Sequence, residues 1–129
     1  FAGYKNCTVY VSTLNDKDLV NTITVMFPSR ENWATLFSDY SNLKEMLTEK
    51  YGEPKDVVEK FDSKYVDNDF DRMHALTMDR CKYTSVFSTK LGDIELSIQH
   101  EGSSNCFVML KYYDKTNSDA VRAAAPDDL

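Results

Sequence analysis

The sequence has little of the material from which recognisable catalytic and cofactor sites are built. It contains only two histidines, His74 and His100, and four isolated glycines in 129 residues. Two histidines leave little from which to build a zinc site or a Ser-His-Asp triad, and glycines that stand singly at predicted turns form no phosphate-binding loop. We therefore expect no cofactor, no metal site and no catalytic residue.

Positive charge and long apolar runs are also scarce. The chain carries 15 Lys and Arg residues against 21 Asp and Glu residues, which gives a net charge of −6. Binding to nucleic acid needs clustered basic side chains that displace counterions from phosphates. A membrane-spanning helix needs about 20 consecutive apolar residues. The sequence shows neither feature, so we expect a water-soluble chain with no nucleic-acid partner and no membrane-spanning segment.

The three cysteines are widely separated and form no metal-binding spacing. Cys7, Cys81 and Cys106 include no CxxC pair and no neighbouring histidine at a ligand distance in sequence. One interpretation is three buried thiols that act as small hydrophobic side chains. The other is a single disulfide with one thiol left over, as in an oxidising compartment. The sequence leaves both interpretations open.

The chain does contain enough apolar material for one folded domain. Hydrophobic residues make up 42% and aromatic residues 12% of the sequence, which is more than disordered chains carry. A domain of this size buries about two-thirds of the surface of its unfolded chain. We predict a single α+β domain over residues 1–114 and a C-terminal tail over residues 115–129 that is frayed or forms a short surface helix.

The clearest element is a long amphipathic helix. Apolar residues recur at three- and four-residue spacing from Trp33 to Tyr51, which places them along one helix face. Ser29 is the expected N-cap. Gly52 and Pro54 are expected to end the helix, since glycine adopts the left-handed C′ conformation and proline cannot continue the helix.

The remaining pattern predicts strands around this helix. Alternating and β-branched segments favour antiparallel strands, and Asp67, Asn68 and Asp69 favour the start of a short second helix. The expected strands are a hairpin at residues 7–12 and 19–27, a weaker strand at 56–61, and a meander at 82–89, 93–99 and 106–113. The fold class is therefore α+β, with an antiparallel sheet of about five strands in the order ββα…βββ packed on the long helix.

One acidic run resembles a calcium loop only superficially. Asp67, Asp69 and Asp71 alternate as oxygen ligands do in an EF-hand. However, the sixth position is Arg72 instead of glycine, and the twelfth is Met78 instead of a bidentate glutamate. The run is better explained by a helix cap and solvated acids.

Tyrosines are the best candidates for ligand contact. Aromatic rings provide large contact areas at low entropic cost, so they serve as stacking platforms for sugars or as anchors for protein partners. Tyrosines outside the helix stripe are the ones free to serve on an open sheet face. We predict a ligand-binding role for Tyr65, Tyr83 and Tyr113.

Four segments together resemble a group of bacterial proteins. The segments are Gly3 to Cys7, Leu47 to Pro54, Gly92 to Ile98 and Tyr112 to Asn117. They are similar to uncharacterised secreted or lipoprotein domains of gut Bacteroidetes, over nearly the whole chain. The resemblance carries over no functional residue. It implies an exported product that has an additional N-terminal portion, located in the periplasm or at the cell surface.

These observations leave three functional hypotheses. The leading one is a non-catalytic exported domain that binds another protein or a small ligand through its open sheet face or hairpin loops. The second is a small hydrolase that acts on a glycan or peptidoglycan with two carboxylates, since acids are plentiful. The third is a structural piece of a larger envelope protein.

Overall fold

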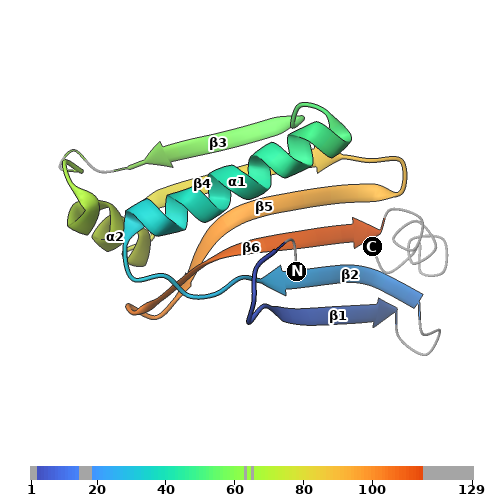
Figure 1. Cartoon of the computed structure of the whole chain (residues 1–129), viewed down its shortest axis with the longest axis horizontal. Coiled ribbons are helices and arrows are strands. Elements are labelled where there is room, and N and C mark those ends of the chain that lie inside the picture. Colours follow the sequence, from blue (N-terminus) through green and yellow to red (C-terminus); the bar gives the residue numbers. More distant parts are fainter. Residues whose placement is uncertain (1–2, 15–18, 63, 65, 115–129) are drawn as a thin grey trace, which may run out of the picture.

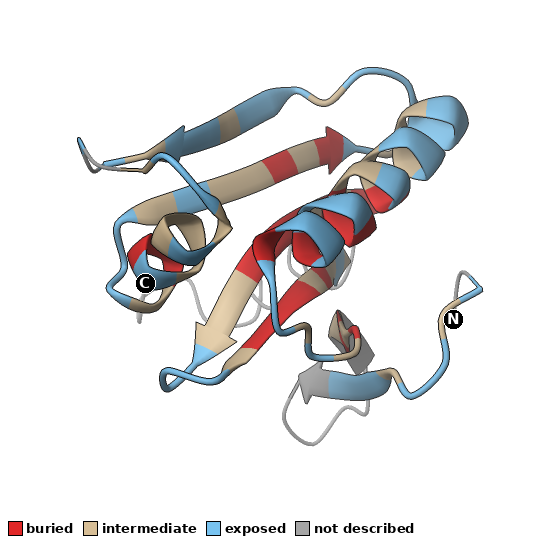
Figure 2. Cartoon of the chain, turned by 60° about the vertical axis from the view of Figure 1, so that its left-hand side comes forward, coloured by how far each residue is buried: buried red, intermediate tan, exposed pale blue. Residues whose placement is uncertain are grey.

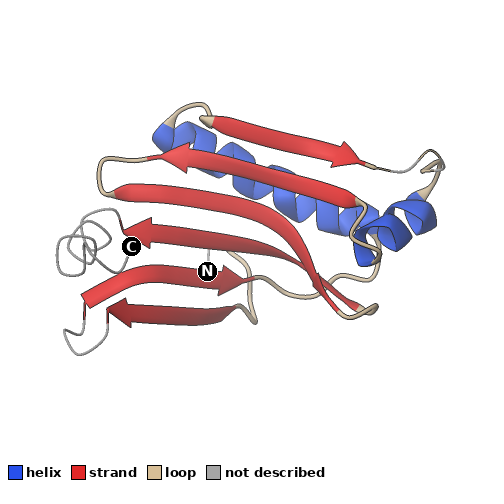
Figure 3. Cartoon of the chain, turned by 180° about the vertical axis from the view of Figure 1, so that it is seen from behind, coloured by secondary structure: helices blue, strands red, loops and turns tan. Residues whose placement is uncertain are grey.

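The computed structural model of the chain describes residues 3–14, 19–62, 64 and 66–114. They form one antiparallel sheet with two helices on one side (Figures 1 and 3). The elements in chain order are β1 (Thr8–Leu14), β2 (Leu19–Met26), α1 (Trp33–Tyr51), β3 (Asp56–Phe61), α2 (Asp69–Thr77), β4 (Cys81–Ser88), β5 (Gly92–Glu101) and β6 (Asn105–Asp114). The predicted α+β class is confirmed. The predicted tail at residues 115–129 lies outside the described residues.

The sheet joins a hairpin to a meander. Its six strands lie in the order β1-β2-β6-β5-β4-β3, and every neighbouring pair is antiparallel. The weakest predicted strand, Asp56–Phe61, forms β3 with the expected bounds and brings the count to six. The chain leaves β2, crosses the meander as α1 and enters the sheet again at its far edge. Hence β1 and β3 are the two edges.

The start of α1 differs from the sequence-based prediction. Asn32, and not Ser29, is the N-cap, and its side chain accepts a hydrogen bond from the Thr35 amide. The chain stays extended beyond β2, because Arg30 still bridges Cys106 of β6. The end of the helix is as predicted, with Gly52 at a positive φ of 87°.

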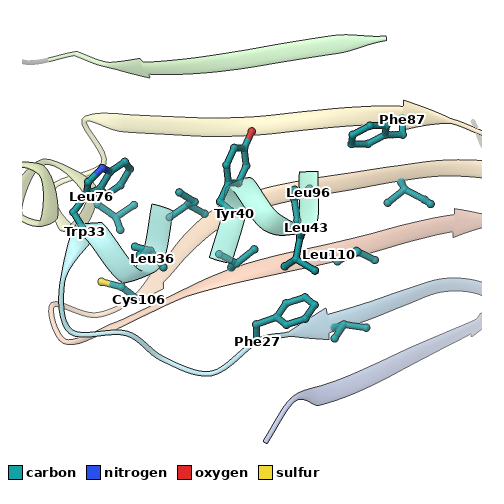
Figure 4. Packing of buried hydrophobic residues seen from close by; sticks show 14 residues of the cluster. Phe27, Trp33, Leu36, Tyr40, Leu43, Leu76, Phe87, Leu96, Cys106 and Leu110 are labelled. Carbon is teal, nitrogen blue, oxygen red and sulfur yellow. The ribbon is translucent and has the colours of Figure 1, made fainter. Parts of the chain in front are cut away.

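The core lies between α1 and the middle of the sheet. The helix packs on β4, β5 and β6, and the buried positions concentrate there (Figure 2). The Tyr40 hydroxyl points toward β4 and lies 2.6 Å from the Ser85 hydroxyl (Figure 4), which satisfies two buried polar groups. Other core side chains include Trp33, Leu36, Leu43, Phe87, Leu96, Val108 and Leu110.

The short helix α2 explains the acidic run. Asn68 is its N-cap and accepts a hydrogen bond from the Asp71 amide. The Asp69 carboxylate accepts hydrogen bonds from the amides of Trp33 and Ala34, both at 2.9 Å. It thereby caps the first turn of α1 from a distant part of the sequence. The interpretation of the run as a helix cap is correct, and Asp69 links the two helices as well.

Candidate functional site

The outer edge at β1 is apolar and uncovered. Val9 and Val11 are 53% and 54% exposed, and Tyr10 between them is 57% exposed. Val9 pairs with the buried Val25, so the two valines point to the side of the sheet on which α1 lies. However, α1 packs mainly over β4 to β6, and Val9 and Val11 remain exposed. We call Thr8 to Ser12, the part of β1 that pairs in register with β2, the β1 edge.

The opposite edge, at β3, has a different composition. Three of its six residues are charged, namely Asp56, Glu59 and Lys60. Glu59 also accepts a hydrogen bond at 3.0 Å from Lys44 of α1. Charges on an edge strand discourage the addition of another strand, because pairing would remove them from water. The β3 edge is therefore protected, whereas the β1 edge carries no charged residue.

An opening separates the first half of β4 from the last part of β5. Their pairing stops at Thr84 and Ser97, while β5 continues to pair with β6 as far as Glu101. The end of α2 lies beside this opening. The last part of β5 curves away from β4 together with β6 (Figure 1). The resulting cavity has a volume of about 390 Å³, and its walls include Asp79, Cys81, Tyr83, Glu95 and His100.

His100 in this opening has both ring nitrogens engaged. Nε2 lies 2.7 Å from a carboxylate oxygen of Asp79, and Nδ1 lies 2.8 Å from the carbonyl oxygen of Gly102. The hydrogen bond to Asp79, together with that to the carbonyl, raises the pKa of His100. Two acceptors favour the doubly protonated imidazolium. No nitrogen of this ring is left to act as a general base.

The thiol in the same opening is not activated. Burial raises the pKa of Cys81 to about 12, so the group is a protonated thiol near neutral pH and a poor nucleophile. Burial also raises the pKa of Cys106, while the Cys7 thiol lies 3.7 Å from the carbonyl oxygen of Tyr4. All three cysteines are described and all are free thiols. Cys106 is buried, as the first interpretation expects, whereas Cys7 and Cys81 are only partly buried.

The buried and helix-capping acids are occupied by structural partners. Asp39 is only 6% exposed, and its carboxylate oxygens lie 2.6 and 3.4 Å from the guanidinium of Arg30. Asp69 caps α1, and Asp71 accepts a hydrogen bond from the Asp67 amide. Within the part of the chain that the structure describes, no three His, Cys, Asp or Glu side chains gather as a metal site would require.

The predicted ligand-binding tyrosines do not form one site. Tyr83 lies on the helix side of β4, where its ring packs against Trp33, Phe61 and Tyr40 at centroid distances of 5.1, 5.6 and 5.7 Å. Tyr113 lies on the opposite face of the sheet, opposite Thr22 of β2. Tyr65 falls outside the described residues. A ligand-binding role for these three residues stays a prediction.

A second hollow lies at the end of α1. It has a volume of about 680 Å³ and combines two aromatic rings with two lysines. Lys50 lies over the ring of Tyr51 at 5.4 Å. The lining residues are Lys50, Tyr51, Ser88, Thr89, Lys90, Leu91 and Tyr112. Sequence reasoning did not single out this hollow, since its residues come from three separate segments.

The comparisons with known proteins give no family and no structural relative. No family model, no curated protein and no solved structure matches the chain. The resemblance to secreted Bacteroidetes domains therefore stays a prediction. No helix within the described ranges has the length and apolarity needed to cross a membrane.

Proposed function

We propose that this chain is a non-catalytic protein-interaction domain that binds an extended segment of a partner along the β1 edge. The observation that carries this proposal is the run Val9-Tyr10-Val11, in which every side chain is more than half exposed. The run lies on an edge strand without charges. Such an edge presents backbone donors and acceptors to an incoming strand.

Strand addition uses both features of the β1 edge. The backbone of an added strand satisfies the outward N–H and C=O groups, which supplies affinity. Side chains of the added strand that point toward the α1 side contact Val9 and Val11, and those on the other face contact Tyr10. A partner segment with apolar residues at alternate positions therefore fits best.

The chemistry of the opening between β4 and β5 supports a non-catalytic role. A nucleophilic cysteine requires a thiolate and a nearby base. Here the Cys81 pKa is raised to about 12, and both nitrogens of His100 are engaged. The contact between His100 and Asp79 instead holds the end of α2 against the β5–β6 hairpin.

A peptide selection tests the proposed function. Displayed random peptides are selected on the chain and then measured against Val11→Lys and the matched control Val57→Lys. Val57 is 40% exposed on the opposite edge strand, so both variants should fold with unchanged circular dichroism. We expect uncharged, β-branched peptides that lose about tenfold or more in affinity on Val11→Lys and keep it on Val57→Lys. Equal binding to both variants would overturn the proposal.

An exported location is part of the same proposal, and the resemblance to secreted domains supports it. Fractionation of cells that express the natural gene product tests the location. Recovery with the cytoplasmic fraction alone would contradict it and would leave the binding mode unaffected.

A further inference from the structure

The β1 edge has a sequence that is nearly the same read in either direction. Around Tyr10, valines stand at positions 9 and 11 and the hydroxyl residues Thr8 and Ser12 stand outside them. Two antiparallel copies of such a strand, centred on Tyr10, place like residues opposite each other. Val9 then faces Val11 of the other copy, and Tyr10 faces Tyr10.

The regular part of the strand coincides with this symmetric segment. Pairing between β1 and β2 is in register from Thr8 to Ser12, and the register shifts between Ser12 and Thr13. The shift passes over Asn21 of β2, and a bulge in the neighbouring strand increases the local twist of the hairpin beyond Ser12. The five residues that pair regularly, Thr8 to Ser12, are therefore the same five whose sequence is nearly symmetric about Tyr10.

From this we infer that the β1 edge pairs with the β1 edge of a second copy of this chain, antiparallel and about a two-fold axis at Tyr10. This inference rests on the proposed function, since it names the partner of the same edge. The result is a continuous sheet across two copies. In an isologous contact one patch must fit itself, and the segment around Tyr10 does so.

The absence of charge on the strand is compatible with a second copy, and the small size of the contact limits its strength. The strand carries no charge, so two copies meet there without like-charge contacts, although each chain has a net charge of −6. Five residues on each side bury less than the roughly 1,200–2,000 Å² of a standard interface. We therefore expect a reversible, concentration-dependent dimer that strengthens when salt screens the net repulsion.

The first measurement is the mass of the full chain in solution. Sedimentation equilibrium from about 1 to about 200 µM should show a rise from 14.8 kDa toward twice that mass. Val9→Lys should weaken dimerisation about tenfold or more, and the control Val57→Lys on β3 should leave it unchanged. A chain that remains monomeric throughout this range would overturn the inference.

A charge-swap experiment then tests the position of the two-fold axis. Tyr10→Lys and Tyr10→Asp should each be monomeric, because residue 10 meets its own copy and like charges repel. An equimolar mixture of the two variants should recover the dimer, since the lysine of one variant then meets the aspartate of the other. Tyr10 is 57% exposed, so both variants should fold with unchanged circular dichroism.

The outcomes separate this inference from the proposed function. Pairing about Tyr10 is contradicted if either Tyr10 variant alone dimerises as the wild type does. It is also contradicted if the equimolar mixture of the two variants stays monomeric. If the chain is monomeric but selected peptides still lose affinity on Val11→Lys, the edge binds another protein and only the second-copy inference fails. If substitutions in β1 change neither the affinity for peptides nor dimerisation, both proposals fail.

Discussion

The covered and uncovered parts of the sheet show the same strand pattern in opposite surroundings. In β5, Ile94, Leu96 and Ile98 alternate with polar residues and are nearly fully buried under α1. In β1, Val9 and Val11 alternate in the same way and remain more than half exposed. The alternation determines which side chains share a face. Whether that face is covered depends on where α1 crosses the sheet, and its main contacts are with β4, β5 and β6.

The largest expected effect comes from cutting a side chain under α1. Leu96 is fully buried between β4 and β6, so Leu96→Ala should lower the free energy of unfolding by about 3 kcal/mol. Val11→Ala removes apolar atoms that already contact water, so its cost should stay below about 0.5 kcal/mol. Urea unfolding of both variants measures the difference.

Dimerisation does not affect the two free energies of unfolding if both variants are measured at low concentration. Under dilute conditions the β1 edge is unpaired, and only its contacts within the chain count. Equal losses for Leu96→Ala and Val11→Ala would show that the β1–β2 hairpin shares the core, contrary to the structure.

The next largest effect concerns the ion pair that connects the segment after β2 to α1. Arg30 follows β2 and its guanidinium lies 2.6 Å from Asp39 of α1, whose side chain is only 8% exposed. Arg30→Met leaves a buried carboxylate without its counter-charge. Removing one partner of a fully buried pair costs about 3–5 kcal/mol, and the partly exposed Arg30 should cost about 2 kcal/mol. Thermal or urea unfolding at neutral pH measures the loss.

An exposed ion pair provides the control for that prediction. Lys55 and Asp93 lie 2.7 Å apart with side chains 49% and 39% exposed. Lys55→Met should therefore change stability by less than about 0.5 kcal/mol. If Arg30→Met lowers the free energy of unfolding as little as Lys55→Met does, then backbone pairing alone holds the segment after β2 in place.

A smaller effect is expected where α2 caps α1. Asp69→Ala removes the acceptor of two backbone amides in the first turn of α1, those of Trp33 and Ala34. Loss of a capping side chain costs about 1 kcal/mol. The matched variant Asp67→Ala changes a neighbouring acid whose backbone amide, which the substitution keeps, donates to Asp71, and it should be near neutral. Equal effects would assign the loss to general charge and not to the cap.

Much of this fold was predictable because its signals are local. The stripe from Trp33 to Tyr51 and the alternation in β5 each depend on neighbours within one element. All six strands were expected, but β3 was the weakest prediction, since Val57 and Val58 are its sole aliphatic residues, and the expected count was therefore about five. The predicted start of α1 was wrong, because Arg30 still pairs with β6 and Asn32 is the N-cap. The carboxylate of Asp69, 36 residues from Trp33, adds a second acceptor that no local pattern indicates.

The candidate site was not predictable in the same way. The β1 segment predicts a half-buried strand, and the sequence contains nothing that states how far α1 extends over it. Tyr83 could equally face a ligand or the core until the register of β4 was known. Likewise, His100 and Asp79 are 21 residues apart, and their contact depends on how the end of α2 meets β5.

The smallest expected effect is a pH dependence at that contact. The hydrogen bond to Asp79 and that to the carbonyl of Gly102 raise the pKa of His100 above its ordinary value of 6.5. A group whose pKa is raised in the folded state contributes stability that is fully present below its unfolded pKa. That contribution is lost as the pH rises through the folded pKa. The Asp79 side chain is 85% exposed, so the contribution should stay below about 1 kcal/mol.

The difference between wild type and His100→Gln isolates this contribution. Urea unfolding from about pH 5 to about pH 8 should show the wild-type advantage shrinking above pH 6.5. His74, whose ring stacks on Phe70 of α2, is present in both proteins and so does not contribute to the difference. An advantage that stays constant with pH would mean that neutral His100 holds α2 against the hairpin as well as the imidazolium does. An advantage that grows with pH would mean that burial, and not the two acceptors, governs the pKa of this histidine.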